Sequence, residues 1–433
     1  MTRLFYSWLM WVLQPLLRLK LQLRARIEPL YLEALQERKG HYQGVVGVGE
    51  KIIWIHAVSL GETRAAVPLI AGLRARLPGM RLLLTHGTAT GREEGKAVLR
   101  PGDIQTWQPW DTPAAVWRFL QHFKPSIGIL METEIWPNLV AGCKEAGVPL
   151  VLANARLSDK SLRQVNRLSW LSHPTYQALT AVWAQTQGDG QRFASLGAPV
   201  QGVFGNLKFD ATTDGPQLTL AQSWREKLGR PVVMLASSRE GEESRLLQIL
   251  QSRPKSEVSC QWLIVPRHPQ RFDEVADLCL AQGFGVSRRS DWVDGPPFVA
   301  ELAADIWLGD SLGEMALYYG LADLALLGGS FEPLGGQNLI EAAACACPVL
   351  MGPHTFNFLE AAELAQQAGA ARRVASLEQA VTEVQTLLRT PEELQAMARA
   401  ATGFAQAHRG ATEQTVAAVL DILRHCGTDR SYA

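Results

Sequence analysis

The chain has 433 residues, 42 basic and 42 acidic side chains, and a hydrophobic fraction of 47%. This length predicts two domains or three, and this composition is typical of a globular protein and excludes disordered, collagen-like and coiled-coil chains. The zero net charge argues against a nucleic-acid binder held by bulk charge, and six cysteines without a Cys-x-x-Cys pair indicate neither a disulfide scaffold nor a zinc site.

The N-terminal segment is apolar and is followed by positive charge. Residues 4–17 have the sequence LFYSWLMWVLQPLL, and four basic residues follow before the first acid, Glu28. The run is shorter than the roughly 20 apolar residues that span a bilayer. No small-residue cleavage site follows it, which disfavours a signal peptide, and a buried core helix fits its Trp residues and cationic flank poorly. We therefore expect residues 1–26 to be a membrane-anchor segment, interfacial or barely spanning, with the basic side cytoplasmic.

The first half of the chain alternates short apolar runs with amphipathic stretches. The predicted strands are Ile52–Val58, Arg81–Thr85, Ser126–Met131, Pro149–Asn154 and Ala181–Gln185. The predicted helices are Glu62–Leu77, Pro113–Phe123, Trp136–Ala146 and Asp189–Leu196. This alternation predicts a parallel sheet with helices on both faces.

A second series of the same kind follows a predicted linker at residues 205–217, which are rich in Gly, Asp and Thr. Its predicted strands are Val232–Ser237, Gln261–Pro266, Asp305–Leu308, Ala322–Leu327 and Pro348–Met351. Its predicted helices are Glu240–Leu250, Asp273–Ala281, Leu312–Tyr319, Asn338–Ala346 and Phe358–Gln367, and Ala411–Leu423 is a closing helix. We therefore expect an anchor at 1–26, doubly wound α/β domains at 27–211 and 212–410, and a closing helix and tail at 411–433.

Open α/β sheets bind ligands at the carboxyl ends of their strands, and two such domains would face a common cleft. The first strand-end motif is His-Ala-Val-Ser-Leu-Gly-Glu, residues 56–62. Glu62 would lie in the first turn of a helix, where a carboxylate can act as a general base. The more usual reason for an acid there is the helix dipole.

The second motif is Met-Glu-Thr-Glu-Ile-Trp-Pro-Asn, residues 131–138. Its carboxylates, Glu132 and Glu134, are unusual in apolar surroundings, although first-turn charge and a core Trp would also explain the pattern. Arg156 and Lys208 follow later strand ends and bring cations to the same edge. Each could equally be a solvated loop charge.

The second half contains three further strand-end motifs. Ser238 and Arg239 open a helix in a way that suits a phosphate. Arg267 and His268 suit a nucleotide, although a basic turn is the simpler alternative. Residues 328–341, GGSFEPLGGQNLIE, place two glycines before a helix whose free N–H groups would point at an anion, with Glu341 able to reach ribose hydroxyls. Metal-dependent nucleotide chemistry is not indicated, because the sequence has no P-loop and no Asp-x-Asp cluster.

Taken in order, these motifs resemble those of the 3-deoxy-D-manno-octulosonic acid (Kdo) transferases of lipopolysaccharide synthesis. The most specific are Glu-Thr-Glu-Ile-Trp-Pro-Asn and Phe-Glu-Pro-Leu-Gly-Gly-Gln-Asn, and the set also includes Pro109-x-Asp111, Asn154–Arg156 and Gly205–Asp210. The resemblance implies a GT-B fold, CMP-Kdo as donor and a tetra-acylated lipid A precursor (lipid IVA) as acceptor. It also implies an inverting, metal-independent transfer without a cofactor, by a membrane-associated enzyme on the cytoplasmic face of the inner membrane.

The resemblance also implies roles for particular residues. Glu62 is similar to the general base of the family. The acceptor and Kdo side would comprise Ser59, Gly61, Glu132, Glu134, Arg156 and Lys208. The CMP side would comprise Ser238, Arg239, Pro266, Arg267, His268, Gly335, Gly336, Gln337, Asn338 and Glu341. Two alternatives stay open: a sugar-nucleotide epimerase of the same fold, which needs no anchor, and a non-catalytic lipid-binding paralogue, which would lack such groups as Glu62.

Overall fold

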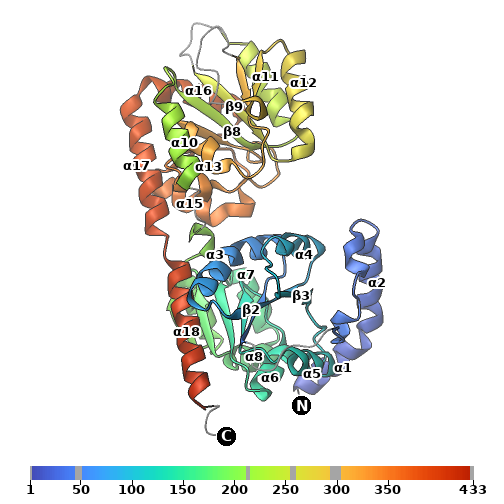
Figure 1. The fold of residues 1–433 in the computed structure, drawn as a ribbon. Coiled ribbons are helices and arrows are strands. Elements are labelled where there is room, and N and C mark those ends of the chain that lie inside the picture. The colour runs from blue at the N-terminus through green and yellow to red at the C-terminus, as the bar shows by residue number, and fades with distance from the viewer. Residues whose placement is uncertain (1, 44–50, 211–214, 254–259, 293–303, 430–433) are drawn as a thin grey trace. The chain divides into compact units, whose positions relative to one another are not determined.

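The structure is a computed structural model that describes residues 2–43, 51–210, 215–253, 260–292 and 304–429. The chain divides into two compact units (Figure 1). The first comprises Met1–Ala211 together with Arg409–Ala433, and the second comprises Thr212–His408. Each contains a parallel seven-stranded sheet with helices on its faces, which confirms the predicted α/β architecture. The closing helix α18 (Ala411–Asp429) belongs to the first unit, where it packs on α3.

The sheet of the first unit has the strand order β3-β2-β1-β4-β5-β6-β7. Its strands are β1 Lys51–His56, β2 Met80–His86, β3 Ile104–Trp107, β4 Ile127–Met131, β5 Leu150–Ala155, β6 Ala181–Ala184 and β7 Val200–Val203. Sequence analysis predicted five of them and missed β3 and β7. These two are four-residue strands at the sheet edges. Half of β3 is buried and no residue of β7 is fully buried, so neither shows a continuous apolar run.

Helices cover both faces of this sheet. They are α3 Leu60–Arg76, α4 Ala89–Lys96, α5 Pro113–Phe123, α6 Pro137–Glu145, α7 Asp159–Asn166, α8 Ser169–Gln177, α9 Gln187–Ser195 and α18. Successive residues of β1 lie on opposite faces of the sheet. Trp54 packs in the cluster under α5 and α6, and Ile53 and Ile55 pack in the cluster under α3 and α18. Because both faces are covered, a central strand such as β4 has no polar side chain and is buried throughout.

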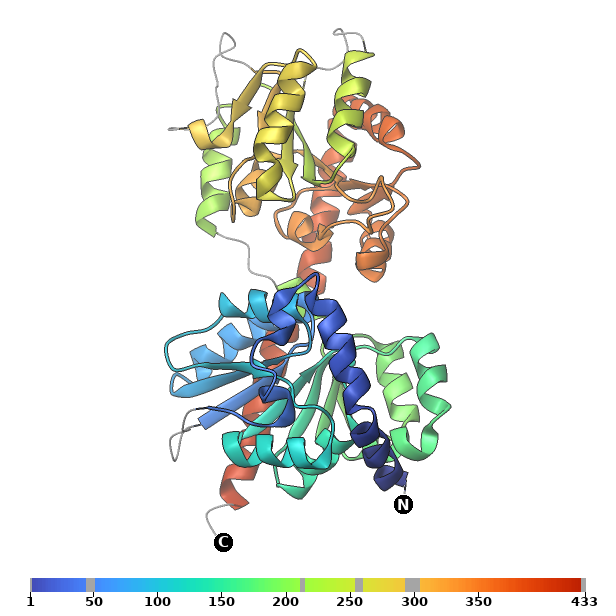
Figure 2. The same cartoon turned by 90° about the vertical axis from the view of Figure 1, so that its right-hand side faces the viewer.

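The predicted anchor segment forms two helices in the first unit, α1 (Thr2–Val12) and α2 (Gln14–Ala25). The short 3-10 helices η1 (Pro29–Leu32) and η2 (Glu37–Lys39) follow, and Figure 2 shows α1 and α2 in dark blue across the front of this unit. Within the described ranges, no helix has both the length and the apolar character needed to cross a bilayer.

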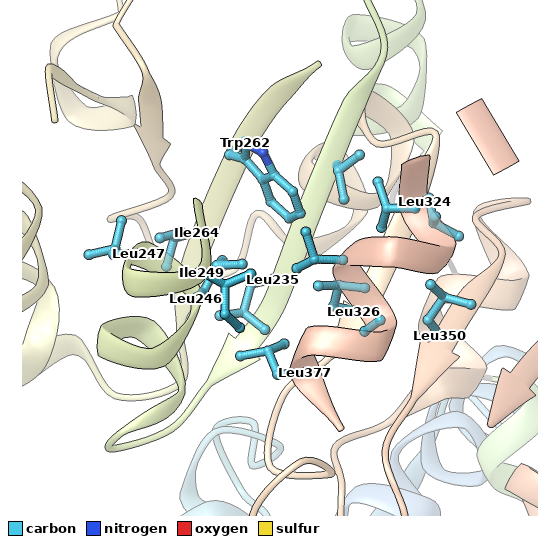
Figure 3. Close-up of a cluster of buried hydrophobic side chains, with 14 of the residues drawn as sticks. Leu235, Leu246, Leu247, Ile249, Trp262, Ile264, Leu324, Leu326, Leu350 and Leu377 are labelled. Carbon is cyan, nitrogen blue, oxygen red and sulfur yellow. The ribbon is translucent and has the colours of Figure 1, made fainter. Parts of the chain in front are cut away.

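The sheet of the second unit has the order β10-β11-β9-β8-β12-β13-β14. Its strands are β8 Val232–Ser238, β9 Gln261–Pro266, β10 Val286–Arg288, β11 Ile306–Leu308, β12 Leu324–Leu327, β13 Val349–Met351 and β14 Ala371–Arg373. Its helices are α10 Gly215–Arg225, α11 Glu242–Gln251, α12 Phe272–Ala281, α13 Met315–Leu321, α14 Leu339–Ala344, α15 Leu359–Gln367, α16 Leu377–Arg389 and α17 Pro391–Ala407. Figure 3 shows the core on one face, where Leu235, Trp262 and Ile264 of the sheet meet Leu246 of α11 and Leu377 of α16.

The prediction that residues 205–217 form a linker throughout is wrong. Residues 207–210 form the 3-10 helix η3, and α10 begins at Gly215; residues 211–214 lie outside the described ranges. The polar composition concealed two apolar side chains, Leu207 and Phe209, which are buried in the first unit. Asn154 accepts a hydrogen bond from the N–H of Leu207 at 3.0 Å, which fixes this segment to the end of β5.

Candidate functional site

Glu62 lies at the carboxyl end of β1, in the first turn of α3. Ser59 is the N-cap, and its side chain accepts a hydrogen bond from the N–H of Glu62. In return the Glu62 carboxylate accepts hydrogen bonds from the N–H of Val58 at 2.8 Å and from the Ser59 hydroxyl at 3.1 Å. This reciprocal arrangement is close to a capping box. Glu62 therefore has a structural role in the helix as well as a position at the sheet edge where ligands bind.

The environment of Glu62 favours its protonated form more than water does. Burial raises the pKa of Glu62 to about 7, and the nearby carboxylates of Glu132 and Glu134 act in the same direction against the hydrogen bond from Val58. Desolvation and like charge both disfavour an ionised carboxylate. A carboxyl group with a pKa near neutrality can accept and release a proton under physiological conditions, which is what a general base requires.

We expect this pKa shift to appear as a pH-dependent stability. The folded protein retains the Glu62 proton over a pH range in which the unfolded chain has lost it, so ionisation of Glu62 lowers the free energy of unfolding as the pH rises from about 4.5 to about 7. Glu62→Gln cannot ionise. Its free energy of unfolding relative to the parent should therefore rise by up to about 3 kcal/mol across that range.

Urea unfolding at a series of pH values measures this difference. Glu93→Gln is a matched control, because the Glu93 side chain is 64% exposed on the neighbouring helix α4. The control should show little change with pH. If the difference in free energy of unfolding between Glu62→Gln and the parent is also independent of pH, Glu62 titrates in its ordinary range.

Two further carboxylates and a cation lie near Glu62. Glu132 follows β4 in a left-handed conformation (φ +56°) and forms an ion pair with Lys208 at 3.0 Å. Glu134 accepts a hydrogen bond from the Trp136 indole at 3.0 Å, and burial raises its pKa. The structure thus brings three predicted carboxylates and Lys208 to one sheet edge.

Two other predicted acceptor-side residues border this group. The side chain of Arg156 is exposed, and the backbone N–H of Arg156 donates a hydrogen bond to the Glu132 carbonyl at 3.3 Å. A Cβ added at Gly61 would meet only the Ser59 hydroxyl, 3.9 Å away. The packing of this unit therefore does not require glycine at position 61, and the space beside the first turn of α3 is open.

Sequence analysis assigned no role to Asp111 or Asn138, although both lie in motifs of the resemblance. The Asp111 carboxylate accepts hydrogen bonds from the N–H groups of Asn138 and Leu139, and so caps α6, and from the Tyr6 hydroxyl at 2.9 Å. The Asn138 amide oxygen accepts a hydrogen bond from the Ser7 hydroxyl at 2.8 Å. These residues attach α1 to the domain, and a motif pattern alone gives no sign of that role.

In the second unit, part of the predicted phosphate site is already occupied by protein contacts. The buried Ser238 hydroxyl donates to Glu243 at 2.7 Å, and Glu243 forms a buried ion pair with Arg271 at 2.7 Å. The N–H of Arg239 donates to Glu242 at 2.9 Å. The Ser238 hydroxyl and the backbone N–H of Arg239 are therefore engaged within the protein. The Arg239 guanidinium pairs with the exposed Glu240 at 3.2 Å and stays the predicted group for an anion at this loop.

The three predicted CMP loops nevertheless gather at one edge of the sheet. The Glu242 carboxylate accepts hydrogen bonds from the N–H of Gly329 at 2.8 Å and of Phe331 at 3.4 Å, which ties the loop after β8 to the loop after β12. The N–H of Arg267, directly after Pro266 at the end of β9, donates to the Ser238 carbonyl at 3.0 Å. Burial and nearby arginines, Arg239 first among them, lower the pKa of His268.

The glycine-rich loop is only partly as predicted. Gly335 and Gly336 have left-handed φ values of +91° and +73°, but α14 has six residues and begins after Asn338, whose side chain caps the Ile340 N–H at 3.1 Å. That N–H is therefore not available to an anion. Glu341 lies in the first turn as predicted, where it accepts a hydrogen bond from the Asn338 amide at 3.0 Å. The Gln337 amide lies against Gly329.

We expect Gly335→Ala to disturb this loop. A Cβ at position 335 would lie 2.4 Å from the Asn357 amide nitrogen and 2.6 Å from the Phe356 ring, whereas Gly313, also left-handed at φ +78°, has nothing within 4 Å. Both substitutions carry the cost of a left-handed alanine, about 1–2 kcal/mol, but only Gly335→Ala must displace its neighbours. CMP affinity, measured by calorimetry, should fall about tenfold or more in Gly335→Ala and stay near the parent value in Gly313→Ala. Equal affinities would place CMP elsewhere.

The part of the chain that the structure describes contains no group of three or more His, Cys, Asp or Glu side chains arranged to hold a metal ion.

Comparison with known proteins gives results that agree in both sequence and fold. Residues 33–211 match the profile of a family described as 3-deoxy-D-manno-octulosonic-acid transferase. A 3-deoxy-D-manno-octulosonic acid transferase of Bordetella pertussis is 46% identical over 86% of this chain and 87% of its own length. One from Haemophilus influenzae is 33% identical over 98% of both chains. The UDP-GlcNAc 2-epimerase structure of Neisseria meningitidis has a TM-score of 0.54 at 17% identity, covering 86% of this chain and all of its own, which indicates a shared fold.

Proposed function

The chain belongs to the family of 3-deoxy-D-manno-octulosonic acid transferases and is a glycosyltransferase, and we propose that it transfers Kdo from CMP-Kdo to a lipid A precursor, lipid IVA. The observation that carries the chemical part of this proposal is the Glu62 carboxyl. It lies at the sheet edge of the first unit, and its pKa is about 7. The reaction proposed is a single inverting displacement that uses neither a metal ion nor a cofactor, as the family resemblance implies.

In this proposal the acceptor sugar hydroxyl attacks C2 of Kdo. The bond from C2 to the CMP phosphate oxygen breaks, CMP leaves with the electron pair, and Glu62 accepts the hydroxyl proton. Attack opposite the leaving group inverts the configuration at C2. Glu132, Glu134 and Lys208 would border the acceptor and the Kdo ring, since they lie on the same sheet edge as Glu62; Ser59, Gly61 and Arg156 lie at the same edge.

The donor would bind to the strand-end loops of the second unit. Negative charge develops on the CMP phosphate as it leaves, and a fixed guanidinium stabilises such charge. Arg239 is the group that we assign to this task, because its side chain is partly exposed and its loop is fixed by Glu242. Pro266, Arg267, His268 and residues 335–341 would hold the nucleotide.

The epimerase alternative has less support than the transferase. Its similarity to this chain is in the fold, at 17% identity, whereas the transferase relatives match in sequence over most of the chain. The non-catalytic alternative would need the acid at position 62 to be purely a helix cap. Its pKa near 7, beside two further carboxylates, favours a chemical role.

We also propose that α1 and α2 attach the enzyme to the cytoplasmic face of the inner membrane. The side of α1 that contacts the domain is polar: Tyr6 and Ser7 form the hydrogen bonds described above, and Arg3 pairs with Glu145 at 2.7 Å. Its large apolar side chains face outward, among them Trp8 and Trp11, which are 58% and 68% exposed. An amphipathic helix that buries its polar side and exposes Trp and Leu has a surface suited to the membrane interface.

A direct assay tests the proposed reaction. The purified full chain is incubated with CMP-Kdo and lipid IVA, and the lipid is analysed by mass spectrometry. We expect the lipid mass to rise by one or more Kdo residues and CMP to appear in step. Release of CMP without a change in lipid mass would contradict the proposed acceptor, and conversion of a sugar nucleotide into its epimer would favour the alternative.

A further inference from the structure

A stack of aromatic and cationic side chains lies at the end of β3 in the first unit, apart from the groups discussed so far. The buried ring of Trp107 is its centre. The Arg38 and Arg92 guanidinium groups lie over that ring, 4.1 and 4.7 Å from its centroid. Tyr31 stacks against Trp107 at 6.1 Å with an interplanar angle of 12°, and Arg24 of α2 lies 5.7 Å from the Tyr31 centroid. Three guanidinium groups therefore share one aromatic column.

Within the described ranges, the charges of this column are not balanced. Glu37 faces it, but its carboxylate pairs with Arg92 at 2.8 Å and accepts a hydrogen bond from the backbone N–H of Trp107 at 2.9 Å. Arg38 forms no ion pair with any residue in the described ranges, although it is only 6% exposed, and its Nε has no acceptor there. In the same part of the chain, the Arg38 side chain donates one hydrogen bond, to the Gly87 carbonyl, and it is long at 3.4 Å. Burial and the other two arginines lower the pKa of Arg38 to about 10.

Fold stability does not explain a buried cation without an anionic partner, because such a group costs free energy unless an anion compensates it. Its location suggests which anion. Gly87 precedes Thr88, the N-cap of α4, and the backbone at Gly91 in the first turn of α4 lies against Val58 and Ser59, next to Glu62. Ala89 at the start of α4 and Ala25 at the end of α2 belong to the same buried cluster as Tyr31 and Trp107.

We propose that Arg24, Arg38 and Arg92 form a binding site for a phosphate monoester carried on a lipid. Three guanidinium groups and one carboxylate leave two positive charges to compensate, and a phosphate monoester carries about −1.5 to −2 at neutral pH. Guanidinium groups bind phosphate oxygens in pairs, which gives both charge and geometry. The anion site itself rests on the arginine cluster; only the lipid origin of the phosphate rests on the proposed function and on the proposed membrane attachment by α2.

Inorganic phosphate is the first probe, with thermal unfolding of the full chain as the readout and CMP present to occupy the donor site. In the parent, phosphate should raise the unfolding midpoint saturably, because a ligand that binds only the folded state stabilises it. Arg38→Met should unfold at the same temperature as the parent or higher without phosphate, since it replaces an uncompensated buried cation by an apolar chain. Its apparent Kd for phosphate should be weaker by about tenfold or more.

Arg64→Met is the matched control, because Arg64 pairs with Glu94 across α3 and α4 and its side chain is 47% exposed; it should respond to phosphate like the parent. Arg24→Gln, on the exposed side of α2, tests the site even if Arg38→Met does not fold. It should weaken phosphate binding without a change in the midpoint of the free protein. Equal phosphate responses in the parent and in these site variants, or no saturable response in the parent, would overturn the proposal.

Vesicles distinguish two sources of such a phosphate, a lipid of the bilayer and the substrate. Phosphatidylcholine vesicles are prepared with phosphatidic acid, a monoester, or with phosphatidylglycerol, a diester. A preference of the parent for phosphatidic acid that Arg38→Met loses would assign the site to a bilayer lipid. Equal vesicle binding by both proteins, with the inorganic-phosphate difference retained, would assign it to the phosphate of a substrate. Kdo transfer is assayed separately, so phosphate binding without transfer would contradict the proposed function alone, and transfer without phosphate binding would contradict this site alone.

Discussion

Replacing Glu62 by glutamine is expected to lower the rate of Kdo transfer by about 10²–10⁴-fold, the usual contribution of a general base, while the protein stays folded. The glutamine oxygen can still accept the hydrogen bond from the Val58 N–H that the carboxylate accepts at 2.8 Å, so the start of α3 stays capped. It cannot accept the proton of the acceptor hydroxyl as a carboxylate does. Turnover under saturating CMP-Kdo, together with thermal unfolding and CMP affinity, measures the three effects separately.

Glu62→Ala provides the structural comparison, because it removes both the proton acceptor and the hydrogen bond that the Glu62 side chain accepts from the Val58 N–H. It should lose turnover to the same extent as Glu62→Gln, and it should be less stable than Glu62→Gln by about 0.5–1.5 kcal/mol, the usual contribution of one hydrogen bond. CMP affinity should be unchanged in both variants, because the proposed nucleotide loops belong to the second unit. Near-normal turnover of Glu62→Gln would place the base elsewhere, with Glu132 and Glu134 as the next candidates. Loss of turnover only in proportion to unfolding would make Glu62 a structural residue.

Replacing the aromatic side of α1 is expected to weaken membrane binding at least about 100-fold. Phe5, Trp8 and Trp11 are each more than half exposed, and an aromatic side chain buries about 150–250 Å² when it is fully enclosed. At about 25 cal/mol per Å², even partial insertion of three such groups provides several kcal/mol. The triple change to glutamine retains Tyr6 and Ser7, so the hydrogen bonds that attach α1 to the domain are kept.

Co-sedimentation with vesicles of phosphatidylcholine and phosphatidylglycerol measures the binding. Trp117→Gln is the control, since Trp117 is a 63% exposed Trp on α5; it should bind vesicles as the parent does. Turnover with a detergent-solubilised acceptor should be retained in the triple variant if α1 acts by localising the enzyme. If the triple variant sediments with vesicles as the parent does, another surface of the protein binds the membrane.

The fold could be predicted from the sequence because both sheets are covered on two faces. Central strands such as β1 and β4 then consist of nearly unbroken apolar residues, and the helices between them carry an apolar stripe. The edge strands β3 and β7 are short and partly exposed, so their sequences look like loops. Residues 207–210 look like a linker for the same reason, since only packing reveals that Leu207 and Phe209 are buried.

The sequence alone determined the kinds of group at the strand ends, and the resemblance of the motifs identified the family that the comparisons then established. Only the tertiary structure decided which of those groups already have hydrogen-bond partners within the protein. The Ser238 hydroxyl is committed to Glu243, and the pKa of Glu62 is raised by burial and by the carboxylates of Glu132 and Glu134, about 70 residues further along the chain. No sequence pattern indicates that the Arg38 guanidinium lies over the Trp107 ring. Hydrogen-bond partners, burial and local charge are set by residues that are distant in the chain and meet only when the sheet forms, so a linear pattern can name a reactive group but cannot say what surrounds it.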